Sequence, residues 1–122
     1  GVSQLTKVIK SSISDIKSSG FNGVMLSVLE DDVLASRFAT GNVTINDLIL
    51  YSSVCGCGID MVPISENTSE VSLTRLAGDV ASLAFRLNKP LGIRTLTIPY
   101  KNPGEMTSFN HDFLTNTVIQ KV

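Results

Sequence analysis

The sequence predicts an α/β domain with a mostly parallel sheet of three to four strands and crossover helices. Short apolar runs alternate along the chain with longer segments in which apolar residues recur at helical spacing. This alternation favours a parallel sheet, because strands joined through a helix lie side by side with a right-handed connection. Residues 1–122 are a common length for a single domain and can bury a core.

An N-terminal helix and a strand are predicted first. The segment 3–20 carries apolar residues at helical spacing, with Ser3 suited to be its N-cap and Gly20 its stop. Residues 23–28 form a short, almost wholly apolar run beside glycine, which is typical of a buried strand.

A second helix is predicted after this strand. Ser27 and Glu30 have the spacing of a capping box. Asp31 and Asp32 follow in the first turn, where negative charge suits the helix dipole. We expect this helix to end before Gly41.

The middle of the chain predicts a third helix, a second strand and the start of a fourth helix. Thr44 and Asp47 have capping-box spacing and mark the third helix, which Leu48, Ile49, Tyr51 and Val54 continue. Residues 59–64 form the second strand, and Thr68 or Ser69 then caps the fourth helix.

The fourth helix has the cleanest apolar stripe, which we assign to the core. Its members are Leu73, Leu76, Ala77, Val80, Leu83, Ala84 and Leu87. Lys89 and Pro90 end this helix. Residues 91–98 form a third strand and residues 117–121 a last one. Because so few strands seldom make a covered parallel sheet, we expect the sheet to continue into material that this chain lacks.

Composition excludes several classes of partner. The chain has 10 Lys plus Arg against 11 Asp plus Glu, without blocks of like charge, so no nucleic acid and no membrane surface is predicted as a partner. It has neither an apolar run of about 18 residues nor a signal-peptide pattern, so we expect a cytoplasmic location. Only 17% of the residues are charged and 43% are hydrophobic. This excess predicts burial against a partner domain or in a homo-oligomer.

The turn Cys55-Gly56-Cys57-Gly58 is the most distinctive motif. It joins a helix to a strand, the reverse of a nucleophile elbow, and the nearby helix C-terminus disfavours a thiolate at Cys55. Three interpretations stay open: a tight turn of small buried residues, a thiol or redox role, and a metal role. Because His111 is the only histidine, a metal would need carboxylates or a partner chain. A dinucleotide site lacks its third glycine here, and the cofactor stays unknown.

Polar residues follow the carboxyl ends of the predicted strands, where α/β sheets and barrels bind ligands. The candidate ligand-binding residues are Glu30, Asp31, Asn67, Thr68, Ser69, Tyr100 and Lys101. Thr68 and Ser69 start a helix, whose free backbone N–H groups can bind an anion. Ordinary capping is the alternative.

Arg94 lies within an otherwise apolar strand. A buried arginine needs a carboxylate or an anionic ligand as its partner. Asp60 is one possible partner, although a turn residue that hydrogen-bonds backbone is the alternative for Asp60. Cys55, Asp60 and Arg94 are therefore the candidate catalytic residues.

Three stretches together resemble a known family: residues 23–31, residues 51–64, and residues 86–91 with Arg94. They resemble the C-terminal part of the domain of unknown function 711 family, also called uncharacterised protein family 0210. The resemblance runs from about Ser19 to Val118, and the cysteine-glycine-aspartate turn is its most specific element.

Family members are longer than this chain, so the resemblance implies that the chain is a C-terminal portion or a shortened relative. It implies a fold similar to the α/β barrel of pyruvate formate-lyase and the anaerobic ribonucleotide reductases, and it supplies no established activity. Glycyl-radical enzymes carry essential cysteines inside this barrel, and Cys55 would be the counterpart. Because the C-terminus shows no recognisable glycyl-radical motif, radical chemistry is not supported.

Two functions therefore compete. The first is an assembly domain that completes a larger barrel or oligomer. The second is a ligand-binding or thiol-dependent enzyme domain with its site around Cys55, Asp60 and Arg94. We favour assembly, because a few strands cannot close a barrel.

Overall fold

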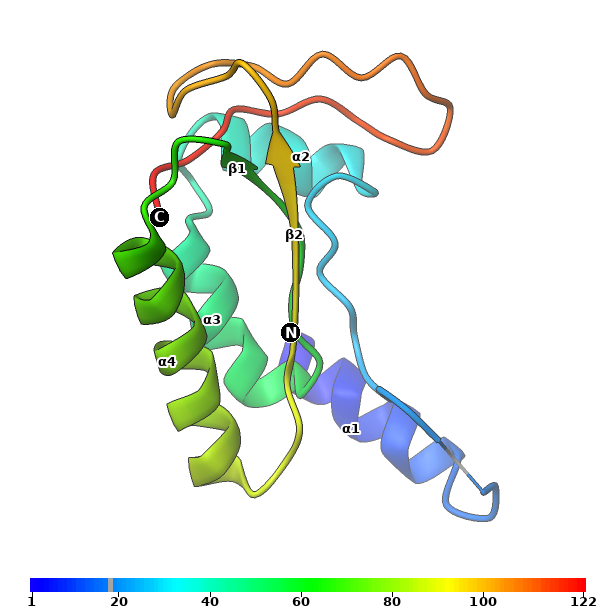
Figure 1. Cartoon of the computed structure of the whole chain (residues 1–122). Helices are drawn as coiled ribbons and strands as arrows, with labels where there is room; N and C mark the ends of the chain where they lie inside the picture. The colour runs from blue at the N-terminus through cyan, green and yellow to red at the C-terminus, as the bar shows by residue number, and fades with distance from the viewer. Residues whose placement is uncertain (18) are drawn as a thin grey trace.

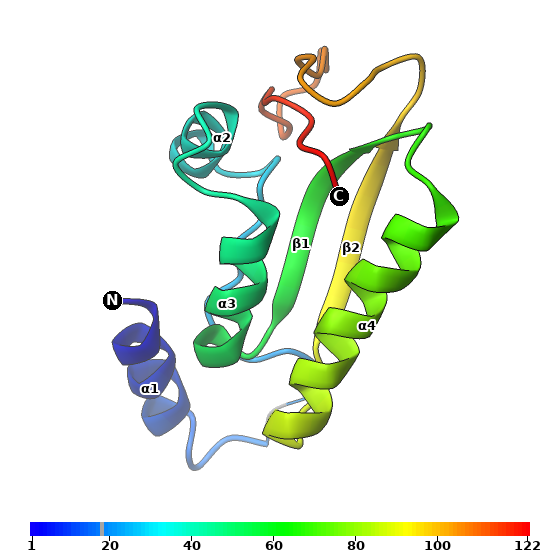
Figure 2. The same ribbon diagram turned by 90° about the vertical axis from the view of Figure 1, so that its left-hand side faces the viewer.

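The computed structural model describes residues 1–17 and 19–122. Figure 1 shows a parallel sheet of β1 (Gly58–Ser65) and β2 (Gly92–Ile98), with α3 and α4 to its left. In Figure 2, which faces that side, α3 lies beside β1 and α4 beside β2. The helices are α1 (Val2–Ser12), α2 (Asp32–Ala39), α3 (Ile45–Cys55) and α4 (Glu70–Leu87). Because α4 connects two parallel strands, the predicted α/β class is confirmed.

Helix α3 begins at the predicted capping box. The Thr44 hydroxyl accepts from the Asp47 N–H at 3.2 Å, and the Asp47 carboxylate accepts from the Thr44 N–H at 2.8 Å. The hydrogen bond from the Thr44 side chain, followed by that from its backbone, lowers the pKa of Asp47. The helix ends at Cys55, where Gly56 adopts a left-handed φ of 68°. Sequence and geometry thus agree at both ends.

Helix α4 is capped by Ser69, one of its two predicted caps. It ends at Leu87 through a left-handed Asn88, just before the predicted stop. Leu76 and Val80 are buried, but Leu73 and Leu87 are 38% and 37% exposed. The prediction that the whole apolar stripe is core was therefore wrong. The apolar face of α4 is larger than the surface of this chain against which the helix packs.

The predicted starts of α1 and α2 were misplaced. α1 begins after Gly1 and ends at Ser12, well before the predicted stop at Gly20. The Ser11 and Ser12 hydroxyls donate to the Lys7 and Val8 carbonyls, a bond that weakens a helix locally. α2 starts after Asp31, whose carboxylate accepts from the Leu34 N–H at 2.7 Å. The predicted capping box at Ser27 does not form: the Ser27 hydroxyl has no hydrogen-bond partner among the described residues, and Asp31 caps the helix instead.

The prediction of three to four strands exceeds the two that the described residues form. The segments 23–28 and 117–121 each retain one isolated bridge, Ser27 with Asp60 and Val118 with Met106. Only the first bridge extends the β1 side of the sheet, in parallel. Its ladder stops there because β1 carries a bulge at this point, and a bulge disrupts pairing.

The core lies between the sheet, α2 and α3. Its buried members are Val28, Phe38, Val43, Ile45, Leu48, Ile59, Val62, Ile64 and Leu76. Burial of one such aliphatic side chain stabilises the fold by about 1.5–3 kcal/mol. The C-terminal segment holds α2 in place through the Thr117 hydroxyl, which donates to the Ala35 carbonyl at 2.7 Å, and through the Gln120 amide, which donates to the Phe38 carbonyl at 2.9 Å.

None of the helices in the described residues combines the length and apolar character that crossing a membrane requires.

Gly58 marks the closest approach of the two strands. Its φ is 105°, and a Cβ atom at this position would lie 2.0 Å from the Gly92 carbonyl oxygen. The adjacent hydrogen bond, from the Gly92 N–H to the Cys57 carbonyl, is 2.8 Å long. Only glycine fits this conformation and this space.

We therefore expect Gly58→Ala to lower the free energy of unfolding by about 3 kcal/mol, because it adds backbone strain and a steric clash. Gly78→Ala is the control. Gly78 lies inside α4 with open space around it, so alanine should stabilise the chain by about 0.5–1 kcal/mol. Urea denaturation measures both, and a neutral Gly58→Ala would contradict the close approach.

Candidate functional site

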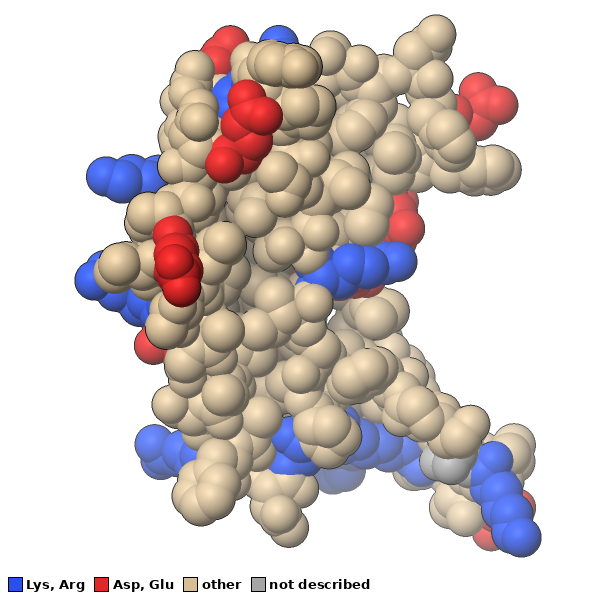
Figure 3. Space-filling model, viewed as in Figure 1, with Lys and Arg blue, Asp and Glu red and all other residues tan. Residues whose placement is uncertain are grey.

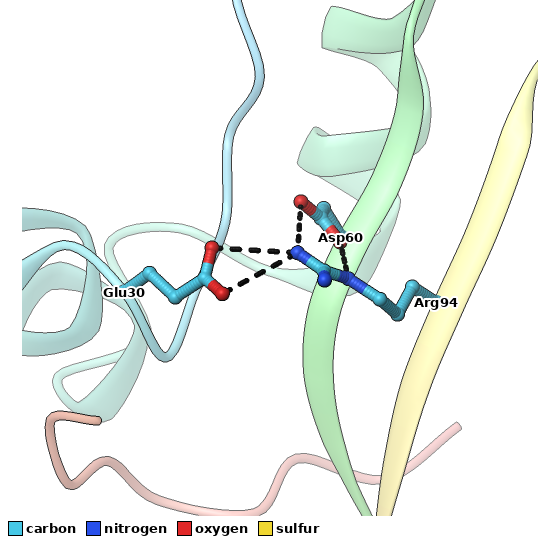
Figure 4. Close-up of polar contacts among 3 residues, drawn as sticks. All are labelled: Glu30, Asp60 and Arg94. Carbon is cyan, nitrogen blue, oxygen red and sulfur yellow. Dashed lines mark hydrogen bonds and ion pairs between the residues drawn. The ribbon is translucent and has the colours of Figure 1, made fainter. Parts of the chain in front are cut away.

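Asp60 and Arg94 form an ion pair across the two strands (Figure 4). The Arg94 Nε atom donates to one Asp60 carboxylate oxygen and Nη2 donates to the other at 2.9 Å. The Asp60 side chain is 3% exposed, and that of Arg94 is 53% exposed. Arg94 thus pairs with the carboxylate that the sequence offered as one possible partner, but the expected burial of Arg94 was wrong, because its side chain reaches across the surface of the sheet. The bidentate geometry is the strongest that a guanidinium and a carboxylate can make.

A β-bulge positions the buried carboxylate. Ile59 lies opposite Ile93 and Val62 opposite Thr95, so β1 contains one residue more than β2 between these pairs. The extra length is absorbed at Met61, which has a left-handed φ of 45°. A non-glycine residue in this region costs about 1–3 kcal/mol, and such strain persists only where the surroundings enforce it.

Glu30 is the third member of the cluster, which we call the Arg94 cluster (Glu30, Asp60 and Arg94). Both Glu30 carboxylate oxygens accept from Arg94 Nη2, at 3.4 and 3.3 Å, and the Glu30 side chain is 44% exposed. The hydrogen bond to Asp60 raises the pKa of Arg94, and the charges of Asp60 and Glu30 raise it further against the opposing effect of burial. The guanidinium therefore stays charged.

Ser27 belongs to the same neighbourhood, and sequence reasoning missed it as a site residue. Ser27 pairs with Asp60 in the isolated parallel bridge and is 9% exposed. Its buried hydroxyl has no hydrogen-bond partner among the described residues. The sequence pattern assigned Ser27 to a capping box with Glu30, so its position beside Asp60 was not predicted.

The cysteine turn is tightly packed. Cys55 is 0% and Cys57 3% exposed, and the Cys57 N–H donates to the Cys55 sulfur at 3.4 Å. Burial raises the pKa of the Cys57 thiol, Cys55 raises it further, and Lys89 opposes the shift. A Cβ atom at Gly23 would lie 2.3 Å from the Cys55 carbonyl oxygen, so the chain passes directly over this turn.

Lys89 also lies at the turn, which sequence reasoning missed because Lys89 served there only as a helix stop. A Cβ atom at Gly56 would lie 2.1 Å from the Lys89 ammonium nitrogen. Burial, followed by the charge of Lys10, lowers the pKa of Lys89.

The candidate catalytic residues thus separate into two groups. Asp60 and Arg94 are joined, whereas no hydrogen bond in the described residues joins Cys55 to either of them. No group of three or more His, Cys, Asp and Glu side chains in the described residues is placed to hold a metal ion.

The predicted strand-end ligand residues also separate. Glu30 joins Arg94, and Asp31 caps α2. A cavity of about 250 Å³ lies at the start of α4, lined by Ser65, Asn67, Thr68, Ser69, Ser72, Pro103, Lys121 and Val122. Lys101 contributes its carbonyl, which accepts from the Ser65 hydroxyl at 2.7 Å, and Tyr100 is 90% exposed.

The asymmetric burial of the ion pair predicts unequal effects of mutation. Arg94→Met leaves a buried carboxylate without its partner and should cost about 3 kcal/mol. Asp60→Asn leaves a guanidinium that water can still reach and should cost about 1–2 kcal/mol. Arg86→Met, which removes an exposed arginine of α4, is the control. Equal losses for the first two variants in urea denaturation would refute this asymmetry.

The packing of the turn predicts unreactive thiols. In the folded chain, iodoacetamide at mildly alkaline pH should label neither Cys55 nor Cys57, because both are buried and the pKa of Cys57 is raised. In denaturing urea both should react. Mass spectrometry measures the labelling, and rapid modification of one cysteine in the folded chain would indicate an accessible, activated thiol instead.

Comparison with known proteins identifies the relatives of this chain. The profile of the family described as "Uncharacterised ACR (DUF711)" matches residues 2–110. UPF0210 proteins of Pyrobaculum arsenaticum and Pyrobaculum aerophilum are 36% and 37% identical to this chain over 86 residues. These residues are 70% of this chain and 19% of each relative. The UPF0210 protein of Oleidesulfovibrio alaskensis is 32% identical over 90 residues, 74% of this chain and 20% of that protein.

No solved structure matches the chain. The chain spans about a fifth of the length of these curated relatives. The match to the family profile shows that it belongs to the DUF711 family of uncharacterised proteins.

Proposed function

We propose that this chain is an assembly domain, which supplies one parallel strand-helix-strand unit to a larger α/β architecture similar to the pyruvate formate-lyase barrel. Its partner is a β-strand from the four fifths of the family sequence that lie outside the matched part. The free edge of β2 is the observation that carries this proposal, since β2 has a neighbouring strand on one side only within the described residues.

The backbone of β2 is suited to pairing with a further strand. The Gly92 N–H donates to the Cys57 carbonyl and the Ile98 carbonyl accepts from the Glu66 N–H, so the even-numbered residues of β2 face β1. By alternation, the backbone groups of the odd-numbered residues 93, 95 and 97 face away. An unpaired edge of this kind is a template for another strand.

The composition of β2 also lacks the usual edge protection. Natural edge strands carry lysine, proline or inward-pointing charges that prevent pairing with other chains. The strand Gly92–Ile98 contains isoleucine, leucine and two threonines, which favour pairing, and it has no proline or lysine. Its sole charged side chain, Arg94, is already bound to Asp60.

Exposed apolar side chains support a buried interface. The largest exposures are Phe85 90%, Tyr100 90% and Phe113 80%, and Ile93 of β2 is 42% exposed. On the face seen in Figure 3, uncharged residues cover much of the surface, and a basic side chain with acidic neighbours lies near mid-height. Monomeric proteins rarely leave large apolar patches in water. The curated relatives are about five times as long as the matched segment, which supports a covering segment elsewhere in the family sequence.

Proline at position 97 tests the edge. Thr97→Pro removes an outward N–H and should leave the pairing of β1 with β2 intact. Thr97→Val, the control, keeps the N–H. Each chain is mixed with the P. aerophilum relative from which the matched 86 residues are deleted, and light scattering measures the mass. The unmodified chain and Thr97→Val should form a complex, and Thr97→Pro should not.

Circular dichroism confirms that each variant remains folded. An unmodified chain that stays monomeric and does not bind the truncated relative would contradict the proposal. Self-association that Thr97→Pro abolishes would make a second copy of this chain the partner instead of the family's remaining sequence.

Of the two parts of the alternative function, the observations favour ligand binding over thiol-dependent chemistry. The Arg94 cluster presents a half-exposed guanidinium, which supports ligand binding. The burial of Cys55 and the raised pKa of Cys57 support a packing role for the turn over thiol chemistry.

A further inference from the structure

We propose that Arg94 is a receptor for the carboxylate group of a small-molecule ligand, and that Glu30 occupies this receptor as an internal competitor. This inference does not depend on the assembly role. The Arg94 side chain extends from β2 over β1, whereas the assembly proposal concerns the opposite, free edge of β2.

The guanidinium is fixed in place by Asp60. Asp60 takes the edge formed by Nε and Nη2, and its buried side chain leaves this pair little freedom. The bulge with left-handed Met61 holds Asp60 in position. An arginine that is anchored along one edge presents its remaining donors in a fixed direction, which lowers the entropic cost of binding a ligand.

Donors remain for a ligand. A guanidinium has five N–H groups, of which Asp60 uses two along one edge. The two N–H groups of Nη1 have no hydrogen-bond partner among the described residues. The edge formed by Nη1 and Nη2 is thus half used, by the contact of Nη2 with Glu30. A carboxylate that lies across this edge would accept from both nitrogens.

Glu30 indicates the chemistry of the ligand. A carboxylate already lies at this position, so the site accepts one sterically and electrostatically (Figure 4). However, its contacts of 3.3 and 3.4 Å exceed the roughly 2.7–2.9 Å of a strong charge-assisted hydrogen bond. Because Glu30 is also 44% exposed, the pair is weak and a ligand can displace it.

Ser27 provides an independent second observation. Its nine-tenths buried hydroxyl lacks a partner among the described residues and lies beside Asp60 in the parallel bridge, on the same face of the sheet. Buried polar groups are ordinarily hydrogen-bonded. An unsatisfied hydroxyl thus lies next to Asp60, the carboxylate that anchors the guanidinium.

An acetate titration tests the receptor. Heteronuclear NMR of the full chain follows the Arg94 Nε–H resonance as sodium acetate replaces sodium chloride at constant ionic strength. Glu30→Gln removes the competitor, so its acetate affinity should exceed that of the unmodified chain by about three- to fivefold, the factor that an exposed ion pair represents. Arg94→Lys removes the fork and should abolish the saturable acetate-dependent shift of the backbone amide resonances of Asp60 and position 94, which can be followed in every variant.

Glu70→Gln is the matched control. Glu70 is an exposed carboxylate at the start of α4, so this variant changes the net charge equally without touching Arg94. Its acetate affinity should equal that of the unmodified chain. An equal gain of acetate affinity in Glu70→Gln would show that the change of net charge causes the effect, and it would overturn the proposal.

Two further outcomes bear on the proposal. Phosphate that binds Glu30→Gln as tightly as acetate, with shifts at many lysines and arginines, would indicate unspecific anion binding and contradict it. If Glu30→Gln loses its folded NMR dispersion, Glu30→Asp replaces it, because the shorter side chain withdraws the carboxylate and keeps the charge. No gain of acetate affinity in the folded variant would refute the competitor role.

Discussion

The bulge in β1 is the constraint on which the candidate site depends. One extra residue between Ile59 and Val62 turns the Asp60 carboxylate towards Arg94, and the left-handed Met61 absorbs the extra length. The same irregularity ends the pairing with the segment 23–28 after one bridge. Because that segment leaves the ladder there, the chain continues into the loop that carries Glu30 to Arg94. A local departure from regular pairing thus limits the sheet and creates its most polar cluster.

Local signals in the sequence predicted the elements that local interactions determine. The capping box of Thr44 and Asp47 was right because it lies within four residues. Asp60 was one possible partner for Arg94, but the burial from which that pairing was argued is absent, because the Arg94 side chain is 53% exposed. The bulge was not foreseen, since it arises from the register between strands that are 34 residues apart. Segment 23–28 was apolar enough for a strand, but hydrophobicity does not reveal whether its edge is paired.

The packing of the cysteine turn favours a structural role over a chemical one. A Cβ atom would lie 2.3 Å from the Cys55 carbonyl oxygen at Gly23 and 2.0 Å from the Gly92 carbonyl oxygen at Gly58, and Gly56 has a left-handed φ of 68°. Three segments thus converge on these few residues. Small side chains are what such convergence requires, and cysteine is among the smallest apolar ones. The motif that is most recognisable in the sequence therefore explains how α1's following loop, α3 and β2 are held together. Its glycines matter at least as much as its sulfurs.

The half-exposed guanidinium of Arg94 has a consequence for the assembled protein. Any segment that covers this side of the sheet replaces water with a medium of lower dielectric constant, in which the attraction between Arg94 and an anion grows. Binding and assembly would then be thermodynamically linked, and each would favour the other by the same factor. In a protein for which both proposals hold, occupancy of the arginine would strengthen the docking of the partner, and docking would raise the affinity of the arginine for its anion.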